Sequence, residues 1–206
     1  MENLAFNFQT ILFFTISYFI GSIPFGYIIF KFKKNDDIRK YGSGNIGATN
    51  VNRLLGKKLG FITLFFDFSK TFFLCLIITI FYGKDLSAIC GFLAILGHIF
   101  PIWLKFKGGK GVASFLGLLC IISWPLTLIF CIVWLITVKL LKFSAAGAII
   151  AIIFNIVIFK LILLMQFSKN ILFWIPGTPF EFNLIFILSI IILYKHKTNL
   201  IGFFRK

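Results

Sequence analysis

The sequence predicts an all-α integral membrane protein, from its composition and from its long stretches without charge. Hydrophobic residues fill 60% of the 206 positions and charged residues only 13%, whereas soluble domains contain about 45–50% apolar and about 25% charged residues. The apolar excess also excludes a disordered chain, and four Cys residues scattered through apolar stretches exclude a disulfide-rich secreted domain. We therefore expect one polytopic membrane domain over residues 1–206.

The first apolar stretch, Asn3–Phe30, carries no charge and is long enough to cross the bilayer. It is too long for a cleaved signal peptide and has no basic residue before it, so we expect a retained helix. Pro24 lies between glycines at positions 21 and 26. A proline in this setting predicts a kink or a loosened second half of the helix.

Five further apolar stretches follow, at about 59–82, 86–104, 111–138, 145–165 and 180–194. The stretch at 111–138 is interrupted by Ser123, Trp124 and Pro125. It forms either one long helix or two helices that turn at the proline. The sequence therefore predicts six or seven membrane spans.

The basic residues decide between these counts, because Lys and Arg collect in short cytoplasmic loops. With seven spans, 17 of the 21 Lys and Arg residues fall on one face. They lie in or directly beside four segments, at about 32–57, 105–111, 139–144 and 195–206. With six spans the same segments divide between the two faces. We therefore expect about seven transmembrane helices, with the amino terminus outside, the carboxyl terminus in the cytoplasm and active-site loops on the cytoplasmic face.

The first cytoplasmic loop combines glycines with hydroxyl, amide and basic side chains, which is typical of phosphate sites. Glycines let backbone N–H groups close around an anion, and hydroxyl and amide groups donate directed hydrogen bonds. An arginine can bind a phosphate through two parallel hydrogen bonds. The candidates are Gly42, Ser43, Gly44, Asn45, Thr49, Asn50 and Arg53.

A nucleotide or nucleic-acid site is rejected for this loop. The spacing Gly42-x-Gly44-x-x-Gly47 matches the dinucleotide-binding pattern, and Asp67 lies 20 residues further on. That pattern requires a preceding strand, whereas here the preceding segment is a charged loop and the acidic residue lies in an apolar span. The aromatic residues are mostly Phe within spans, so the net charge of +15 does not indicate nucleic acid.

The second cytoplasmic loop places Lys107, Gly108, Gly109, Lys110 and Gly111 directly before a predicted helix. A helix amino terminus offers unpaired N–H groups and the positive end of the helix dipole to an anion. The alternative is a basic turn whose glycines only make it tight. We favour phosphate binding, because three glycines within four residues exceed what such a turn needs.

The remaining polar candidates are isolated ionisable residues. In the tail, His196 and Asn199 are three positions apart and share a face if the tail is helical. His98 is either structural or part of the site, and we favour the structural interpretation. Asp67 and Lys70 lie one turn apart inside a span, where they are either functional or a pair that neutralises itself for packing. No His, Cys, Asp or Glu spacing indicates a metal site, so we expect neither a metal nor a cofactor.

Four segments in this order resemble the bacterial acyl-phosphate-dependent glycerol-3-phosphate acyltransferase family (PlsY type). They are Gly21–Gly26, Gly42–Arg53, Gly97–Ala113 and the pair His196-x-x-Asn199. The resemblance covers essentially the whole chain. It implies transfer of a fatty acyl group from acyl phosphate to the 1-hydroxyl of glycerol 3-phosphate, with release of lysophosphatidic acid and phosphate. It also implies a role in phospholipid biosynthesis at the bacterial cytoplasmic (inner) membrane, and we expect a monomer.

The resemblance also implies roles for individual residues. The expected catalytic residues are Ser43, Arg53, Lys110, His196 and Asn199. The expected phosphate-binding residues are Gly42, Gly44, Asn45, Thr49, Asn50, Lys107, Gly108, Gly109, Gly111 and Ser144. In the tail, Lys197 and Thr198 stand where the family usually has an arginine and a glutamate.

The residues leave two questions open: which group accepts the proton, and whether the chain is an enzyme or a transporter. Acyl phosphate is already an activated anhydride, so no covalent intermediate is needed. The proton acceptor is either a phosphate oxygen of the substrate, which we favour because nothing in the sequence orients the ring of His196, or His196 itself. The alternative function is a small transporter or channel for an organic phosphate, although the chain lacks the paired broken helices that many transporters show. A structural subunit that holds anionic lipid would not need the glycine spacing.

Overall fold

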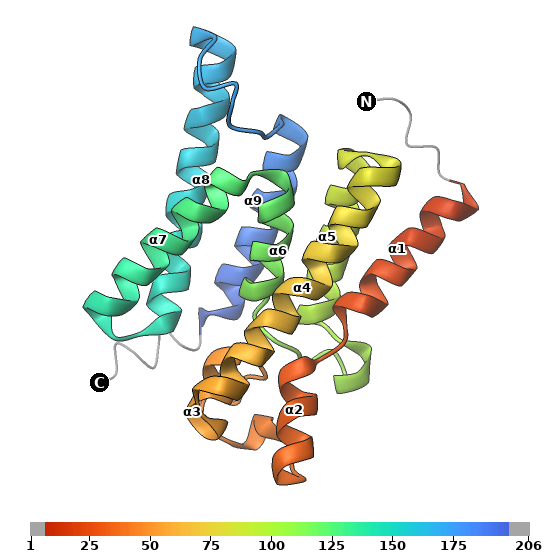
Figure 1. Cartoon of the computed structure of the whole chain (residues 1–206), viewed down its shortest axis with the longest axis vertical. Coiled ribbons are helices and arrows are strands. Elements are labelled where there is room, and N and C mark those ends of the chain that lie inside the picture. Colours follow the sequence, from red (N-terminus) through yellow and green to blue (C-terminus); the bar gives the residue numbers. More distant parts are fainter. Residues whose placement is uncertain (1–6, 198–206) are drawn as a thin grey trace. The chain divides into compact units, whose positions relative to one another are not determined.

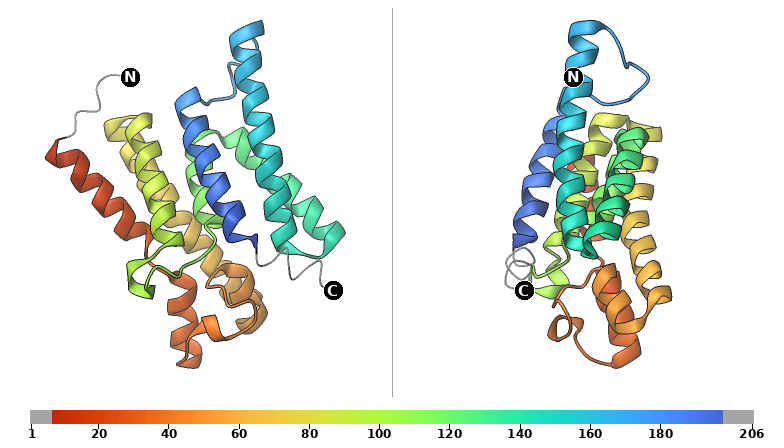
Figure 2. Two further views of the ribbon diagram at one scale, coloured as in Figure 1. Left: turned by 180° about the vertical axis from the view of Figure 1, so that it is seen from behind. Right: turned by 90° about the vertical axis from the view of Figure 1, so that its left-hand side faces the viewer.

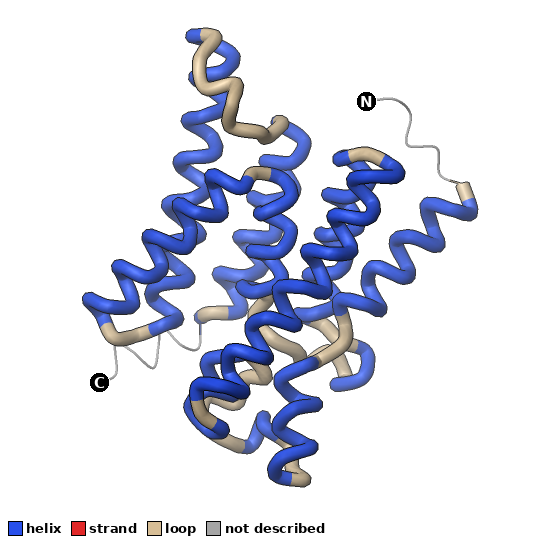
Figure 3. Tube along the Cα trace, in the orientation of Figure 1, coloured by secondary structure: helices blue, strands red, loops and turns tan. Residues whose placement is uncertain are grey.

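The computed structural model describes residues 7–197, and every regular element in this part of the chain is a helix (Figures 1 and 3). The α-helices are α1 (Phe8–Gly21), α2 (Phe25–Lys34), α3 (Ala48–Leu55), α4 (Lys57–Tyr82), α5 (Lys84–Ile99), α6 (Val112–Ile122), α7 (Trp124–Leu141), α8 (Ser144–Lys169) and α9 (Pro179–Lys195). Two short 3-10 helices are η1 (Ile38–Lys40) and η2 (Ile102–Leu104). The chain divides into two compact units, Met1–Leu118 and Leu119–Lys206, and each is described by itself.

Five helical segments of the described chain are long and apolar enough to cross a bilayer. They are Phe8–Lys34, Lys57–Tyr82, Lys84–Leu104, Trp124–Leu141 and Ser144–Lys169. The shorter apolar helix α6 has 11 residues and α9 has 17. The all-α membrane class is confirmed. The count of seven spans and the orientation stay predictions.

The predicted weakness near Pro24 is a complete break between α1 and α2. The helix ends at Gly21 and restarts at Phe25. A Cβ atom at Gly21 would overlap the backbone carbonyl oxygen of Ala94, so glycine lets α1 pack closely on α5. The hydroxyl of Ser22 accepts a hydrogen bond of 2.8 Å from the indole Nε1 of Trp103. The break is therefore held by the segment that follows α5.

In the first unit, α5 packs against both α1 and α4, and α3 packs on α4 (Figures 1 and 2). One end of this unit carries the start of α1 and the α4–α5 turn. The other end carries α2, α3 and the connection from α5 to α6. A small apolar core fills this second end and consists of Phe30, Ile38, Ile46, Val51 and Leu104. The first two polar loops are therefore parts of one folded layer.

In the second unit, α8 packs against both α7 and α9. The stretch at 111–138 forms two helices, because α6 ends at Ile122 and α7 starts at Trp124 with a proline in its first turn. A proline is favoured at that position since it has no N–H to leave unpaired. At the start of α9, Thr178 and Glu181 form a capping box, in which each side chain accepts a hydrogen bond from the other residue's backbone N–H.

Candidate active site

Asn50 holds the glycine loop that precedes α3. Its side-chain oxygen accepts hydrogen bonds from the backbone N–H of Ser43 at 3.0 Å and from Arg53 Nη1 at 3.2 Å. Its amide nitrogen donates to the carbonyl oxygens of Tyr41 at 3.1 Å and Asn45 at 2.9 Å. A primary amide has two donors and two acceptor positions, so this residue is fully used by the loop. Asn50 thus sets the shape of the loop.

Two glycines of this loop are required by the backbone. Gly42 and Gly44 have φ angles of +60° and +69°, a region that L side chains rarely adopt. A Cβ atom at Gly42 would also overlap the Oδ1 atom of Asn50. The tight loop and its amide support therefore depend on each other.

The side chains of Ser43, Thr49 and Arg53 are exposed, and that of Asn45 is half-buried. Arg53 lies in the last turn of α3 and reaches back to Asn50. Its guanidinium is therefore oriented while part of it remains open to solvent. A loop with an oriented arginine and an exposed hydroxyl is suited to holding a phosphate.

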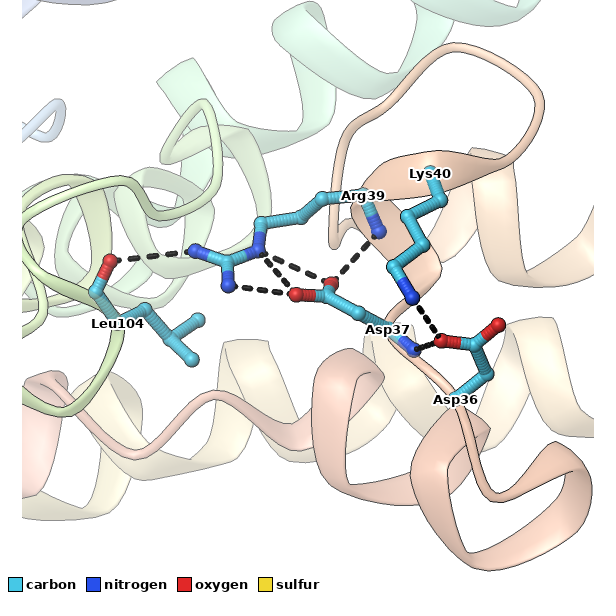
Figure 4. Close-up of polar contacts among 5 residues, drawn as sticks. All are labelled: Asp36, Asp37, Arg39, Lys40 and Leu104. Atoms are coloured by element: carbon cyan, nitrogen blue, oxygen red, sulfur yellow. Dashed lines mark hydrogen bonds and ion pairs between the residues drawn. The ribbon is translucent and has the colours of Figure 1, made fainter.

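Arg39 connects this loop to the second one (Figure 4). Its Nε atom lies 3.0 Å from both carboxylate oxygens of Asp37, and its Nη2 lies 2.6 Å from one of them. Nη1 donates to the carbonyl oxygen of Leu104 at 3.2 Å. The guanidinium also lies over the ring of Tyr27, at 5.6 Å from its centroid. Since Leu104 ends η2, this arginine fixes the distance between the two polar loops.

The carboxylates beside Arg39 are stabilised in their charged form. Hydrogen bonds from the guanidinium hold the pKa of Asp37 below its ordinary value. The neighbouring Asp36 accepts hydrogen bonds from Lys40 and Tyr41, which hold its pKa well below the ordinary value. At neutral pH the ion pairs of Asp37 with Arg39 and of Asp36 with Lys40 therefore hold the start of the loop.

The second loop packs against the end of α5. The backbone N–H groups of Gly108 and Gly109 donate to the carbonyl oxygens of Ile99 and His98, at 3.2 and 3.1 Å. A Cβ atom at Gly108 would overlap the His98 carbonyl oxygen, and one at Gly109 would overlap the His98 ring. These two N–H groups therefore bond to the protein, and the phosphate-binding role of Gly108 and Gly109 stays a prediction.

The other donors of this loop lie on both sides of these two glycines. Gly111 has a φ of +90° and leads into α6, whose first N–H groups have no acceptor within the helix. Lys107 is exposed and Lys110 is half-buried. The predicted phosphate site at this loop thus reduces to two lysines and a helix amino terminus.

Beneath the second loop lies a buried ionic cluster. Lys70 Nζ lies 2.9 Å from Asp67 Oδ1 and 2.9 Å from His98 Nδ1. It also donates to the carbonyl oxygen of Ile23, in the break between α1 and α2, at 2.8 Å. Ser114, in the first turn of α6, donates to the carbonyl oxygen of Asp67 at 2.9 Å. This cluster connects three helices directly below the glycine segment.

The other predicted site residues belong to the second unit. Ser144 is the first residue of α8. His196 follows α9, and its Nδ1 lies 2.8 Å from the carbonyl oxygen of Ile192, so Nδ1–H is the donor. The ring is therefore oriented, contrary to what the sequence indicates. Asn199 and Thr198 lie outside the described residues.

Within residues 7–197, no group of three or more His, Cys, Asp or Glu side chains is placed to hold a metal ion. The four cysteines are unpaired thiols within helices. At the first unit's loop end the carboxylates of Asp36 and Asp37 are paired with Lys40 and Arg39, and the loops also carry the cations of Arg53, Lys107 and Lys110. Such a set is suited to binding anions.

A family sequence profile described as glycerol-3-phosphate acyltransferase matches residues 11–206. This chain belongs to the glycerol-3-phosphate acyltransferase family. A glycerol-3-phosphate acyltransferase of Brucella anthropi is 42% identical over 183 residues, which cover 89% of this chain and 84% of the relative. One of Thermotoga petrophila is 41% identical over 189 residues, covering 84% of this chain and 96% of the relative.

Two solved structures are similar to the whole acyltransferase chain. The crystal structure of PlsY (YgiH), an integral membrane glycerol 3-phosphate acyltransferase, in its glycerol 3-phosphate form has a TM-score of 0.82 and 32% identity. It covers 96% of this chain, and this chain covers 92% of it. The lysophosphatidic acid form has a TM-score of 0.80 and 31% identity with the same coverage. The predicted family and the integral membrane fold are confirmed.

Two features of this acyltransferase were not predicted from its sequence. Arg39 was counted only among the basic residues that indicate orientation, and its bond to Leu104 spans 65 positions. The Lys70 and Asp67 pair was predicted, but the participation of His98 was not. The available signal was the presence of ionisable residues inside two apolar stretches, Asp67 and Lys70 in one and His98 in the other.

Proposed function

We propose that this acyltransferase moves a fatty acyl group from acyl phosphate to the 1-hydroxyl of glycerol 3-phosphate, giving lysophosphatidic acid and inorganic phosphate. The reaction would take place at the bacterial cytoplasmic membrane, with a monomeric enzyme and no cofactor. The family name supports glycerol 3-phosphate as the acceptor. The glycerol 3-phosphate and lysophosphatidic acid forms of the similar PlsY structure support the acceptor and the product.

The observation that carries the proposal is the joining of two phosphate-type loops at one end of the first unit. Arg39 bonds to Leu104, and the side chains of Leu104 and Val51 lie in the same small core. The reaction needs two phosphates held at a fixed separation, one on each substrate. Two basic, glycine-containing loops on one rigid layer meet that need.

In the proposed reaction, the glycerol oxygen attacks the acyl carbonyl carbon. A carbon–oxygen ester bond forms, and the bond between the acyl carbon and the phosphate oxygen breaks. The hydroxyl proton passes to a phosphate oxygen of the donor, which leaves as inorganic phosphate. Lys107 and Lys110 would stabilise the departing phosphate, and Arg53 with Ser43 would hold the other phosphate.

Two groups could accept the proton of the glycerol hydroxyl: a phosphate oxygen of the substrate or the ring of His196. A substrate phosphate oxygen needs no protein base, and acyl phosphate brings one next to the reacting carbon. His196 is the alternative, and its Nδ1–H bond to Ile192 leaves Nε2 unprotonated in the neutral ring. Replacing His196 by Ala and by Gln separately tests this choice. Near-normal turnover in the Gln variant excludes His196 as the base.

The deciding assay uses the purified full chain in detergent with palmitoyl phosphate and glycerol 3-phosphate, and measures lysophosphatidic acid. Palmitoyl-CoA in place of palmitoyl phosphate is the matched control. Product from the phosphate and none from the thioester supports the proposed donor. Product from palmitoyl-CoA alone keeps the acyltransferase activity and rejects the donor. If no lysophosphatidic acid forms from either donor, or from palmitoylated acyl-carrier protein, the acyltransferase proposal is rejected.

A further inference from the structure

The side chains of Asp67, Lys70 and His98 form a buried cluster that the proposed reaction does not use. Their side chains are 3%, 3% and 4% exposed. Charged side chains inside a membrane span are costly unless they are paired, and they commonly mark a functional site. Here Asp67 and Lys70 of α4 contact His98 in the last turn of α5, the end on which the second loop packs.

The hydrogen-bond geometry fixes the proton on the histidine ring. A lysine ammonium has three N–H donors, and Lys70 Nζ has three neighbours in reach: Asp67 Oδ1, the Ile23 carbonyl oxygen and His98 Nδ1. His98 Nδ1 lies 2.9 Å from this ammonium and 3.4 Å from Asp67 Oδ1, so the shorter contact makes Nδ1 an acceptor. A proton on Nδ1 would instead place two donors 2.9 Å apart. The neutral ring therefore carries its proton on Nε2.

That Nε2–H group lies at the second loop. A Cβ atom built on Gly109 would overlap His98 Nε2, and would lie 2.8 Å from Cε1. Within the described part of the chain, the contacts of the ring to Lys70 and Asp67 are made by Nδ1, and Nε2 is not among the fully enclosed polar atoms that lack a partner. An acceptor outside the protein can therefore reach Nε2–H, and the loop beside it is one that we propose to hold a phosphate. An oxygen of that anion would be such an acceptor.

We propose that His98 donates its Nε2–H to a phosphate oxygen of a substrate held at the Gly108–Gly111 loop. Asp67 and Lys70 are positioning residues, because Lys70 fixes the tautomer of the ring and Asp67 fixes Lys70. A ring in this state has no free lone pair, so His98 acts as a donor and not as a base. This inference rests on the proposed function, since it places a phosphate substrate at this loop.

The tautomer is tested on the unmodified protein by ¹⁵N NMR of protein labelled at histidine. The chain has two histidines, and a His196→Asn variant assigns their signals. We expect a protonated Nε2 and an unprotonated Nδ1 for His98, and a change in the Nε2 signal when glycerol 3-phosphate or inorganic phosphate is added. A protonated Nδ1, or an Nε2 signal that responds to neither anion, overturns the inference.

Kinetics tests the contact with the substrate. His98→Phe keeps a planar aromatic ring and removes the donor, so KM for glycerol 3-phosphate or for palmitoyl phosphate should rise about 10- to 100-fold, the usual range for a lost hydrogen bond to a charged group. The substrate whose KM rises is the one held there. His98→Gln restores a donor near the Nε2 position and should recover most of the loss. An unchanged KM for both substrates in His98→Phe overturns the inference.

Ser87→Ala is the matched control for stability. Ser87 is buried on α5 and donates to the Cys75 carbonyl oxygen of α4 at 2.8 Å, so it joins the same two helices. Its loss should lower the unfolding temperature and leave both KM values unchanged. The two proposals fail separately. Wild-type turnover with a normal KM in His98→Phe rejects only the role of His98, whereas a wild-type enzyme that makes no product rejects the proposed function.

Discussion

The guanidinium of Arg39 donates a hydrogen bond of 3.2 Å to the carbonyl oxygen of Leu104, although the two residues lie 65 positions apart. The same guanidinium is held from the other side by the carboxylate of Asp37. This contact joins the loop that contains Ser43 to the segment that leads into the second glycine loop. The first two predictions concern this contact.

Replacing Arg39 by Ala should lower kcat/KM about tenfold or more, since a bond to a charged donor contributes about 1.5–3 kcal/mol. Arg39→Lys should recover only part of this, because a lysine cannot bond to Asp37 and Leu104 with one planar group. Lys40→Ala is the matched control. Its ion pair with Asp36 is on the surface, where water and salt screen such pairs and they contribute little to stability. Equal activity in Arg39→Ala and Lys40→Ala would contradict the coupling of the two loops.

The order of the first loop should depend on pH through Asp37. The pKa of this carboxyl is lowered in the folded chain by Arg39. Its contribution to stability is therefore fully present above the ordinary value of about 4 and is lost as the pH falls through the lowered pKa. Protection from hydrogen exchange over residues 36–53, expressed relative to the intrinsic exchange rate at each pH, should fall only at acidic pH. Asp37→Asn should remove much of this dependence, and a loss of protection as the pH rises from about 5 to 7 would contradict the sign.

Asn50→Ala should disable the glycine loop. The change leaves the Ser43 N–H and the carbonyl oxygens of Tyr41 and Asn45 without their partner, at about 1–3 kcal/mol for a buried group. Displacement of reacting groups by about 1 Å can cost about 100-fold in rate, so we expect a loss of that order in kcat/KM. Asn52→Ala, an exposed position on the same helix, is the control. A normal kcat/KM in Asn50→Ala would show that the loop holds its shape without this amide.

The sequence predicts the membrane helices well, because each helix that crosses a bilayer needs a long apolar stretch without charge. The apolar stretch at 59–82 corresponds to α4 (Lys57–Tyr82). The helix breaks lie beside Pro24 and Pro125, because proline has no backbone N–H to continue the preceding helix. The helix α3 (Ala48–Leu55) was not predicted. It is short and polar, and it is stabilised by packing on α4 rather than by its own pattern.

The residue types of the site could be predicted, but not their partners. Asn50 was assigned to the substrate because an amide in a glycine loop suits a phosphate, yet its four hydrogen bonds go to the loop itself. Gly108 and Gly109 were expected to point N–H groups at an anion, and they are needed because α5 lies against them. In both cases the deciding neighbour depends on the tertiary fold, which one sequence does not contain.

Gly109→Ala should abolish most activity, because the added methyl group would overlap the ring of His98 beneath the loop. A fully packed contact cannot absorb this without moving the loop or the ring. Gly83→Ala is the matched control at the opposite end of the first unit. Gly83 has a φ of +89° with open space around it, so alanine there costs about 1–3 kcal/mol of backbone strain. Both variants should unfold at lower temperatures, and only Gly109→Ala should lose turnover per folded molecule. Wild-type turnover in Gly109→Ala would mean that the loop relaxes freely.

Stability and activity should separate at the buried pair of Lys70 and Asp67. Lys70→Met leaves the carboxylate of Asp67 buried without its lysine, and breaking such a pair costs about 3–5 kcal/mol. The double variant Asp67→Leu with Lys70→Met removes both charges, and apolar replacements of buried pairs are often neutral in stability. Its unfolding temperature in detergent should therefore recover toward the wild-type value. Its KM for a phosphate substrate should remain raised, because nothing then fixes the tautomer of His98. A double variant with both normal stability and normal KM would assign the cluster to packing alone.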